Sequence, residues 1–143
     1  MMHVKRGMTA SVARTVVESD ILKFAFATGD INPVHLDEEF ARTTRFGKRI
    51  AHGMLSASFF SAVLGTRLPG PGTIYLKQSL EFCRPVFIGD TITATVTVTH
   101  VKRKTNRAWL KTVCTNDKGK PVVIGRALVM LESKPSTPVS NAN

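Results

Sequence analysis

The feature that most constrains this chain is a change of hydrophobic period near residue 70. Residues 54–64, MLSASFFSAVL, form the longest apolar run and are interrupted only by serines. Because the run is apolar on nearly all faces, it predicts a central helix that is buried against a sheet. After the turn cluster of residues 69–72, apolar and polar residues alternate with a period of two, which predicts long strands with one covered face. Helices followed by antiparallel strands indicate the α+β class, with an antiparallel sheet wrapped around one buried helix.

Shorter segments complete the predicted architecture. Residues 9–17 are rich in threonine and valine and indicate a first strand. Ser19 and Asp20 supply N-cap chemistry for a helix over residues 21–28, which Gly29 ends, and the acidic residues 37–39 begin a second, short helix. Further strands are expected over residues 73–82, 92–98, 109–115 and 122–131. We expect one domain over residues 1–132 and a disordered, Ser/Pro/Asn-rich tail over residues 133–143.

Asp30 and His35 form the first candidate functional pair. Between them lies Asn32-Pro33, which favours a turn and should keep this segment from forming regular helix. The carboxylate and the imidazole can then lean toward each other within reach of one water molecule, as a general acid/base pair would. Taken alone, an aspartate after a glycine often caps a turn, and a lone histidine is more often a surface or core residue. Asn32 is expected to fix the loop and orient the pair.

His52-Gly53 is the second candidate motif, at the start of the predicted central helix. The backbone N–H groups at a helix start lack intrahelical acceptors, and the positive end of the helix dipole favours negative charge there. The alternative for this dipeptide is a helix start with unusual backbone angles and no chemical role. His52 itself is interpreted as a residue that packs the loop rather than as a second base.

These motifs carry a family resemblance. GDINPVH at residues 29–35, Ala41 and IAHGML at residues 50–55 resemble the MaoC-like (R)-specific enoyl-CoA hydratases, in particular the short members that serve polyhydroxyalkanoate synthesis. Similarity continues through LPGPGTIYL at residues 68–76 and FCRPVFIGD at residues 82–90, and it covers roughly residues 9–131. The resemblance implies a single hot-dog fold, a homodimer with each active site near the subunit interface, and hydration of trans-2-enoyl-CoA to (R)-3-hydroxyacyl-CoA.

The implied reaction assigns a role to each candidate residue. Addition of water to an enoyl thioester needs a base for the water, a proton for the α-carbon and an oxyanion hole. Asp30 is the expected base, His35 holds the water with it, and the Gly53 N–H is the expected oxyanion donor. The family suggests that Ser61 reaches the site, although a buried serine that bonds its own helix is an equal alternative. Candidates to line an acyl tunnel, which are first of all core residues, are Phe59, Phe60, Val63, Leu64 and Leu68.

The formal net charge of +10 bears on partners. Nucleic acid is disfavoured, because the basic residues are scattered and one tyrosine and one tryptophan offer little for base stacking. The phosphates of coenzyme A, or an acidic acyl carrier protein, would be steered toward a basic rim. The main alternative is therefore an (R)-3-hydroxyacyl-ACP dehydratase of fatty acid synthesis, the same chemistry on a carrier protein. A hot-dog thioesterase also stays open. A non-catalytic acyl-CoA- or nucleic-acid-binding module is disfavoured, because a module that only binds has no need for a water-activating pair such as Asp30 and His35.

The remaining composition predicts a cytoplasmic protein without bound groups. The histidines and cysteines form no metal-ligand set, and the implied chemistry requires neither a metal nor a cofactor. Cys83 and Cys114 lie far apart and are interpreted as free, partly buried thiols of a reducing compartment. No run approaches the ~20 apolar residues that span a bilayer. The first residues carry positive charge but no apolar run after it, so we expect no signal peptide.

Overall fold

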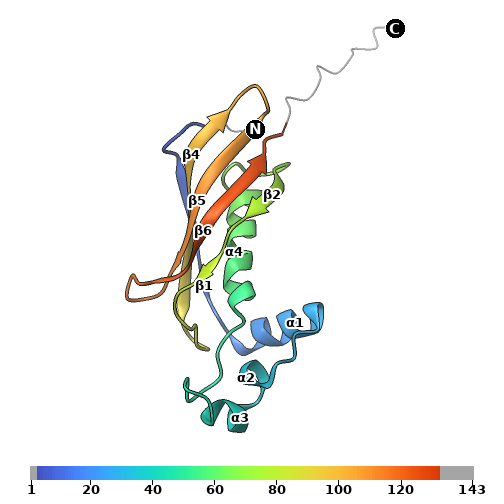
Figure 1. Cartoon of the computed structure of the whole chain (residues 1–143), viewed down its shortest axis with the longest axis vertical. Helices are drawn as coiled ribbons and strands as arrows, with labels where there is room; N and C mark the ends of the chain where they lie inside the picture. Colours follow the sequence, from blue (N-terminus) through green and yellow to red (C-terminus); the bar gives the residue numbers. More distant parts are fainter. Residues whose placement is uncertain (1–2, 133–143) are drawn as a thin grey trace, which may run out of the picture.

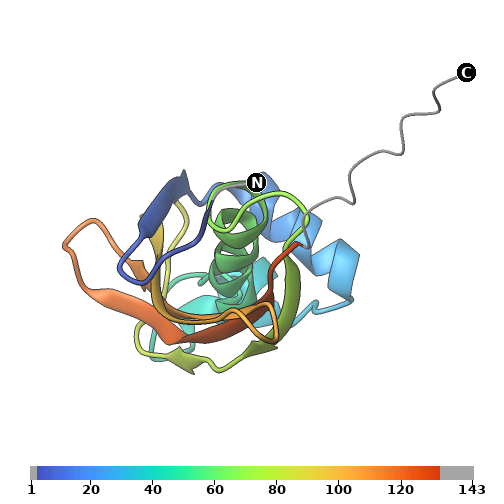
Figure 2. The ribbon, with the colours of Figure 1, turned by 90° about the horizontal axis from the view of Figure 1, so that it is seen from above.

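The protein, described by a computed structural model over residues 3–132, is built on one curved sheet; the predicted tail of residues 133–143 lies outside the described residues. The sheet is antiparallel with the strand order β1-β4-β5-β6-β2, and the short β3 also pairs with β6. It curls around the long helix α4, as Figures 1 and 2 show from two directions. This confirms the predicted α+β class and the sheet wrapped around a helix. The strands are β1 (Thr9–Thr15), β2 (Ile74–Gln78), β3 (Glu81–Phe82), β4 (Thr91–Lys102), β5 (Arg107–Thr115) and β6 (Pro121–Met130).

Three short helices gather at one end of α4 (Figure 1). The helices are α1 (Glu18–Thr28), α2 (Pro33–Leu36), α3 (Glu38–Arg42) and α4 (Gly53–Thr66). The predicted N-cap of α1 at Ser19-Asp20 is wrong, because the helix already begins at Glu18 and Val17 is its N-cap. The Asp20 carboxylate instead accepts the Val17 N–H from within the first turn, at 2.9 Å. None of the helices within residues 3–132 has the length and apolarity that crossing a membrane requires.

The hydrophobic core lies between α4 and the sheet. Strand β4 alternates as predicted: Ile92, Ala94 and Val96 are fully buried, and threonines alternate with them on the other face. From α4, Phe60 and Val63 are fully buried in the same core. Strand β4 therefore presents its apolar face to the helix, which removes that apolar surface from water.

The other side of α4 departs from the prediction of a helix buried on nearly all faces. Met54 is 51% exposed, and Ser58 and Ser61 are exposed along the same side of the helix. The sheet covers α4 on one side only, and a groove beside β2 remains along the other, lined in part by Leu76. Ser58 and Ser61 therefore lie on the exposed face, whereas Ser56 is buried toward the sheet, where its carbonyl accepts from Cys114 of β5.

The strand predicted over residues 73–82 is interrupted, and its apolar face is covered only in part. Residues 79 and 80 separate β2 from β3, and a bulge shifts the pairing within β2. At the interruption the carbonyl oxygen of Ser79 lies where a Cβ on Gly125 would stand, 1.8 Å from that position, so only glycine permits this crossing. Ile74 and Phe82 are 55% and 52% exposed. Leu80 of the same face packs against the core, so the covered face expected from the period-two pattern is present only in part in the single chain.

Candidate active site

Asp30 stands on the loop between α1 and α2. Gly29 ends α1 in the left-handed conformation (φ 80°), as the sequence predicted, and its N–H donates to the Ala25 carbonyl at 2.8 Å. The chain then turns, and Asp30 lies exposed with one carboxylate oxygen accepting the Asn32 N–H at 3.3 Å. Because this single, long hydrogen bond leaves most of the carboxylate free, Asp30 can accept a proton from a ligand in front of it.

His35 is placed by a single helical turn. We expected no regular helix here, but Pro33 fits the first position of α2, and the Asn32 side chain caps it by accepting the Val34 N–H at 3.2 Å. Asn32 therefore holds the loop, as predicted. The buried ring of His35 bonds through Nδ1 to the Ile50 carbonyl oxygen at 2.8 Å. Since a carbonyl only accepts, Nδ1 carries the proton, and Nε2 keeps a free lone pair.

The environment of His35 favours its neutral form. Burial lowers the pKa of His35, and the neighbouring His52 ring lowers it further; the Ile50 carbonyl and the Asp30 carboxylate act in the opposite sense but do not reverse the shift. A neutral imidazole with Nε2 unprotonated can accept a hydrogen bond from water, which an imidazolium cannot. The structure therefore presents two acceptors, the Asp30 carboxylate and His35 Nε2, at one place.

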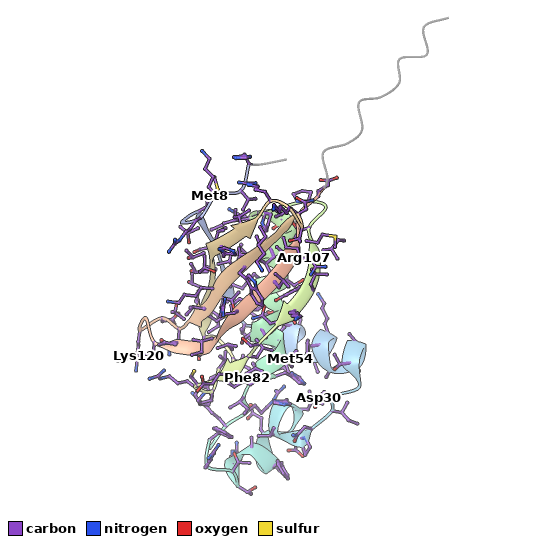
Figure 3. All side chains as sticks on the ribbon, turned by 45° about the horizontal axis from the view of Figure 1, so that its top comes forward. Met8, Asp30, Met54, Phe82, Arg107 and Lys120 are labelled. Carbon is purple, nitrogen blue, oxygen red and sulfur yellow. The ribbon has the colours of Figure 1, made fainter. Side chains whose placement is uncertain are left out.

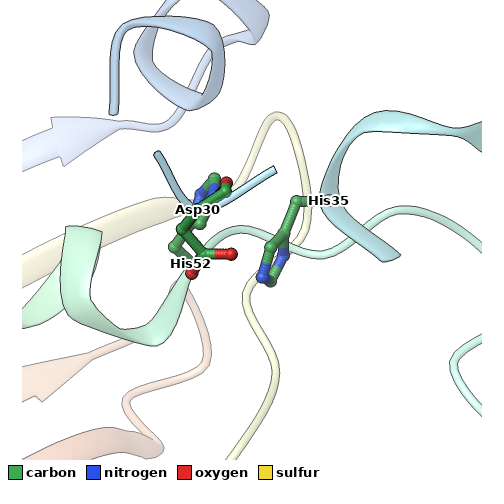
Figure 4. A group of neighbouring side chains, drawn as sticks. All are labelled: Asp30, His35 and His52. Carbon is green, nitrogen blue, oxygen red and sulfur yellow. The ribbon is translucent and has the colours of Figure 1, made fainter. Parts of the chain in front are cut away.

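His52 lies behind this pair and contacts both members (Figure 4). Its Nε2 donates to the backbone carbonyl of Asp30 at 2.9 Å, and its ring lies 3.9 Å from that of His35, centroid to centroid. Phe24 covers another side of the His52 ring at 4.8 Å. His52 is only 2% exposed, so it packs the loop, as the sequence predicted, and it also links the backbone of Asp30 to the ring of His35.

Gly53 begins α4 beside these groups. As the first residue of the helix its N–H has no intrahelical acceptor, and the N-cap residue His52 contributes no side-chain cap. A Cβ on Gly53 would lie 2.7 Å from the ring of Phe82, so a side chain here would collide with β3. Gly53, Asp30, His35 and His52 all line one cleft of about 430 Å³. Figure 3 labels three residues of this cleft, Asp30, Met54 and Phe82.

This arrangement matches a known protein family. Residues 2–118 match the family model of the MaoC-like domain. The chain belongs to the MaoC-like family. The sequence is 55% identical to an (R)-specific enoyl-CoA hydratase of Rhodospirillum rubrum over 92% of this chain and 90% of that protein. It is 47% identical to a 3-hydroxybutyryl-CoA dehydratase of Methylorubrum extorquens over 90% of this chain and 81% of the relative.

A solved structure extends the comparison to the fold. The (R)-hydratase from A. caviae, whose description says that it is involved in PHA biosynthesis, superposes with a TM-score of 0.89 at 42% sequence identity. The match covers 92% of this chain and all of that one. The MaoC-like chain therefore has the single hot-dog fold that the sequence resemblance implied.

The three side chains Asp30, His35 and His52 hold their potential ligand atoms within 4.8 Å of one another, which raises the question of a metal. In this MaoC-like site one nitrogen of each ring is already bonded to a backbone carbonyl. The two rings are tilted by 32° to each other, and the remaining nitrogen of His52, Nδ1, is buried. A metal ion needs lone pairs that converge on one point at about 2.0–2.2 Å. The geometry fits a water molecule between Asp30 and His35 better than an ion.

Ser61 and the predicted tunnel residues lie elsewhere. Ser61 is exposed on α4 and lines the groove beside β2, not the cleft of Asp30 and His35, so the alternative of a buried serine bonding its own helix is wrong. Met54 borders both hollows. The five candidates for a tunnel lining are all part of the buried core, as their spacing first indicated. Cys114 is buried, whereas Cys83, expected to be partly buried, is exposed at the cleft.

An ion pair between the buried Arg49 and the half-exposed Glu18 lies next to the site and was not predicted from the sequence. The Arg49 side chain donates to the backbone carbonyl of His35 and to the carboxylate of Glu18 at the start of α1. The two residues are 31 positions apart, and neither belongs to a recognisable motif. The only available signal was a charged residue directly before the apolar pair Ile50-Ala51, which is a weak indication of a buried arginine.

Proposed function

We propose that this MaoC-like protein is an (R)-specific enoyl-CoA hydratase, a carbon–oxygen lyase that adds water to trans-2-enoyl-CoA. One observation carries the proposal: the Asp30 carboxylate, the free Nε2 of His35 and the N–H of Gly53 line the same cleft. These are the groups that hydration of an enoyl thioester needs. The names of the most similar relatives agree with this reaction in one direction or the other.

The hydrogen-bond directions define how the water would be held. Because His35 donates through Nδ1 to Ile50, its Nε2 accepts one hydrogen of the water, and the Asp30 carboxylate accepts the other. The lone pair of the water oxygen then points away from both residues toward the substrate. Asp30 is the base in this arrangement, and His35 orients the water without changing its own protonation.

The proposed reaction adds a hydroxyl group and a proton, both from one water molecule, across the double bond. The water oxygen bonds to the β-carbon of the enoyl group as Asp30 removes a proton from it. The π electrons move to the α-carbon and thioester carbonyl, and the negative charge on the carbonyl oxygen is stabilised by the Gly53 N–H at the helix start. The proton on Asp30 then passes to the α-carbon on the same face, which restores the carboxylate and completes the addition.

Charge and shape at the cleft support a thioester of coenzyme A as the substrate. Arg45 and Arg84 line the cleft with the site residues, so cationic groups stand where phosphates would approach. Met54 borders both the cleft and the groove beside β2, and the lining of this groove includes Ala57, Leu76 and Leu80. This apolar route is our candidate for the acyl chain, and it leaves the core residues Phe60 and Leu64 out of contact with substrate.

We infer that the protein acts as a homodimer in the cytoplasm, with a role in polyhydroxyalkanoate synthesis like that stated for the A. caviae relative. The dimer is supported by β2, which ends the strand order and exposes Ile74 and Leu76. An exposed apolar edge strand is a surface that proteins normally cover. Sedimentation equilibrium tests this point, and a monomer at micromolar concentration would contradict it.

Hydration of crotonyl-CoA by the purified protein tests the proposed function. Loss of the conjugated-enoyl absorbance, with a product consumed only by an enzyme selective for (R)-3-hydroxyacyl-CoA, is the expected result. Parallel reactions with the crotonyl thioester of acyl carrier protein separate the hydratase from the carrier-protein dehydratase. Faster turnover of the carrier thioester would favour that alternative, and release of free thiol would instead reveal a thioesterase.

A further inference from the structure

Arg49 is an unusual residue of this fold. It is 9% exposed and is the only lysine, arginine, aspartate or glutamate buried within residues 3–132. Removing a charged group from water is costly unless partners satisfy it, so a buried arginine needs a full set of acceptors. The hydrogen bonds of Arg49 therefore identify both the acceptors that stabilise its charge and the groups that it orients.

Three donors of the Arg49 guanidinium are used. Its two terminal nitrogens donate to the two carboxylate oxygens of Glu18 at 2.8 and 2.9 Å, which is a bidentate fork. Its Nε donates to the backbone carbonyl of His35 at 2.7 Å. Because the guanidinium is planar and rigid, fixing the fork on Glu18 also fixes the direction of Nε toward His35.

The His35 carbonyl requires such a donor. Helix α2 has only four residues, and the last carbonyls of a helix have no intrahelical N–H partner. The neighbouring Ile50 contributes two more contacts: its N–H donates to the Val34 carbonyl at 3.3 Å, and its carbonyl accepts from the His35 ring at 2.8 Å. Residues 49 and 50 thus hold both the main chain and the imidazole of His35.

We propose that Arg49, oriented by its fork on Glu18, is a positioning residue that sets the place and orientation of the His35 imidazole. The role in catalysis rests on the proposed function, whereas the effect on the ring does not. Without the guanidinium, the end of α2 loses its donor and His35 can shift or rotate. Positional errors of about 1 Å can lower rates by roughly 10²-fold.

The kinetic test uses Arg49→Lys, which keeps the charge but cannot form the fork and the Nε bond together. We expect kcat to fall about tenfold to a hundredfold, with KM changed by less than about twofold, because the binding surface is kept. Glu18→Gln keeps one acceptor and should give a smaller fall. Arg42→Lys is the matched control: Arg42 pairs with Glu38 at 4.0 Å on the exposed face of α3, and its loss should leave kcat unchanged.

The second readout is independent of activity. Long-range ¹H–¹⁵N spectra report which nitrogen of each imidazole is protonated, and the chain has four histidines. The His35 signals are identified by their loss in His35→Gln. In Arg49→Lys we expect these signals to leave the Nδ1–H pattern or to broaden, while those of His3 and His100 stay in place.

The outcomes separate the two proposals. A folded Arg49→Lys protein with wild-type kcat and unchanged His35 signals overturns the positioning role. So does a rate loss that matches a lower folded fraction with the His35 signals intact. If the wild-type protein shows no hydratase activity, the proposed function fails, and the spectra alone decide whether Arg49 positions the ring. Should Arg49→Lys not fold, Glu18→Gln, altered at a half-exposed side chain, gives both readouts.

Discussion

Replacing Asp30 with asparagine separates the chemistry of the site from its structure. Asp30 is exposed, and within residues 3–132 its side chain makes one hydrogen bond, the acceptance of the Asn32 N–H at 3.3 Å. Asparagine keeps an oxygen that can accept this bond, so the loop should keep its shape. Exposed substitutions of this kind change stability by about 0.5 kcal/mol or less. What disappears is the negative charge and the ability to take a proton.

The expected cost therefore falls on the chemical step. Loss of a general base lowers the rate by roughly 10²–10⁴-fold. At about 1.36 kcal/mol for each factor of ten, the barrier rises by about 2.7–5.4 kcal/mol. The assay is the loss of enoyl absorbance from crotonyl-CoA, with kcat and KM measured separately. We expect the change in kcat, with KM nearly constant, because asparagine fills the same volume in the cleft.

Asp37→Asn is the control for Asp30→Asn. Asp37 is also exposed, lies seven residues away and accepts one backbone N–H, that of Phe40 at 3.2 Å, as the N-cap of α3. Asparagine is an equally good N-cap, so this variant should keep the wild-type rate. Equal losses in both variants would point to a disturbed loop. An Asp30→Asn enzyme with more than about a tenth of the wild-type kcat would refute the base assignment, since a lost base costs at least about 10²-fold.

Four further predictions concern the other groups of the site. His35→Gln should lower kcat by about 10²-fold or more without unfolding, and full activity with an unchanged circular dichroism spectrum would exclude His35. As the pH is lowered, kcat should begin to fall only below the ordinary histidine pKa of 6.5, because the lowered pKa of His35 keeps its imidazole neutral at pH 6.5. The same shift means that the unfolded chain binds the proton more tightly, so urea midpoints should fall as the pH drops below 6.5. Gly53→Ala should lower kcat, since its methyl would lie 2.7 Å from the Phe82 ring and alanine keeps the backbone N–H; a wild-type kcat in Gly53→Ala would contradict the expected collision.

The parts of the fold that rest on local pattern were predictable. The alternation of apolar residues and threonines along β4 predicted a strand with one buried face, and Ile92 and Val96 are buried as expected. The stop at Gly29 follows from the ease with which glycine adopts a positive φ. The proximity of Asp30 and His35 could be predicted because both residues lie on one short segment, although Pro33 begins helix α2 instead of preventing helix there.

Contacts between distant segments were not predictable. Glu18 and Arg49 meet only because α1 folds back against residues 49–50, and a single sequence carries no pattern for such a meeting. The prediction that Ile74 lies on a covered face was wrong for a related reason. A period of two indicates that one face of a strand is apolar, but it does not indicate what covers that face. The same applies to Ser61 on helix α4: the sequence pattern does not show whether a serine among apolar residues faces the core or an open groove.

The active cleft is assembled from two segments, and the second of them holds the first. Along residues 49–53, Arg49 binds the His35 carbonyl, Ile50 accepts from the His35 ring, and His52 donates to the Asp30 carbonyl. Gly53 follows directly with the free N–H that starts α4. Since α4 is anchored in the core by Phe60 and its neighbours, this segment connects a rigid helix to a loop that has few contacts of its own. Preorganisation of the proposed water site therefore originates in the packing of α4 against the sheet, and changes in residues 49–52 should alter kcat more than changes of equal size in the exposed loop around Ile31.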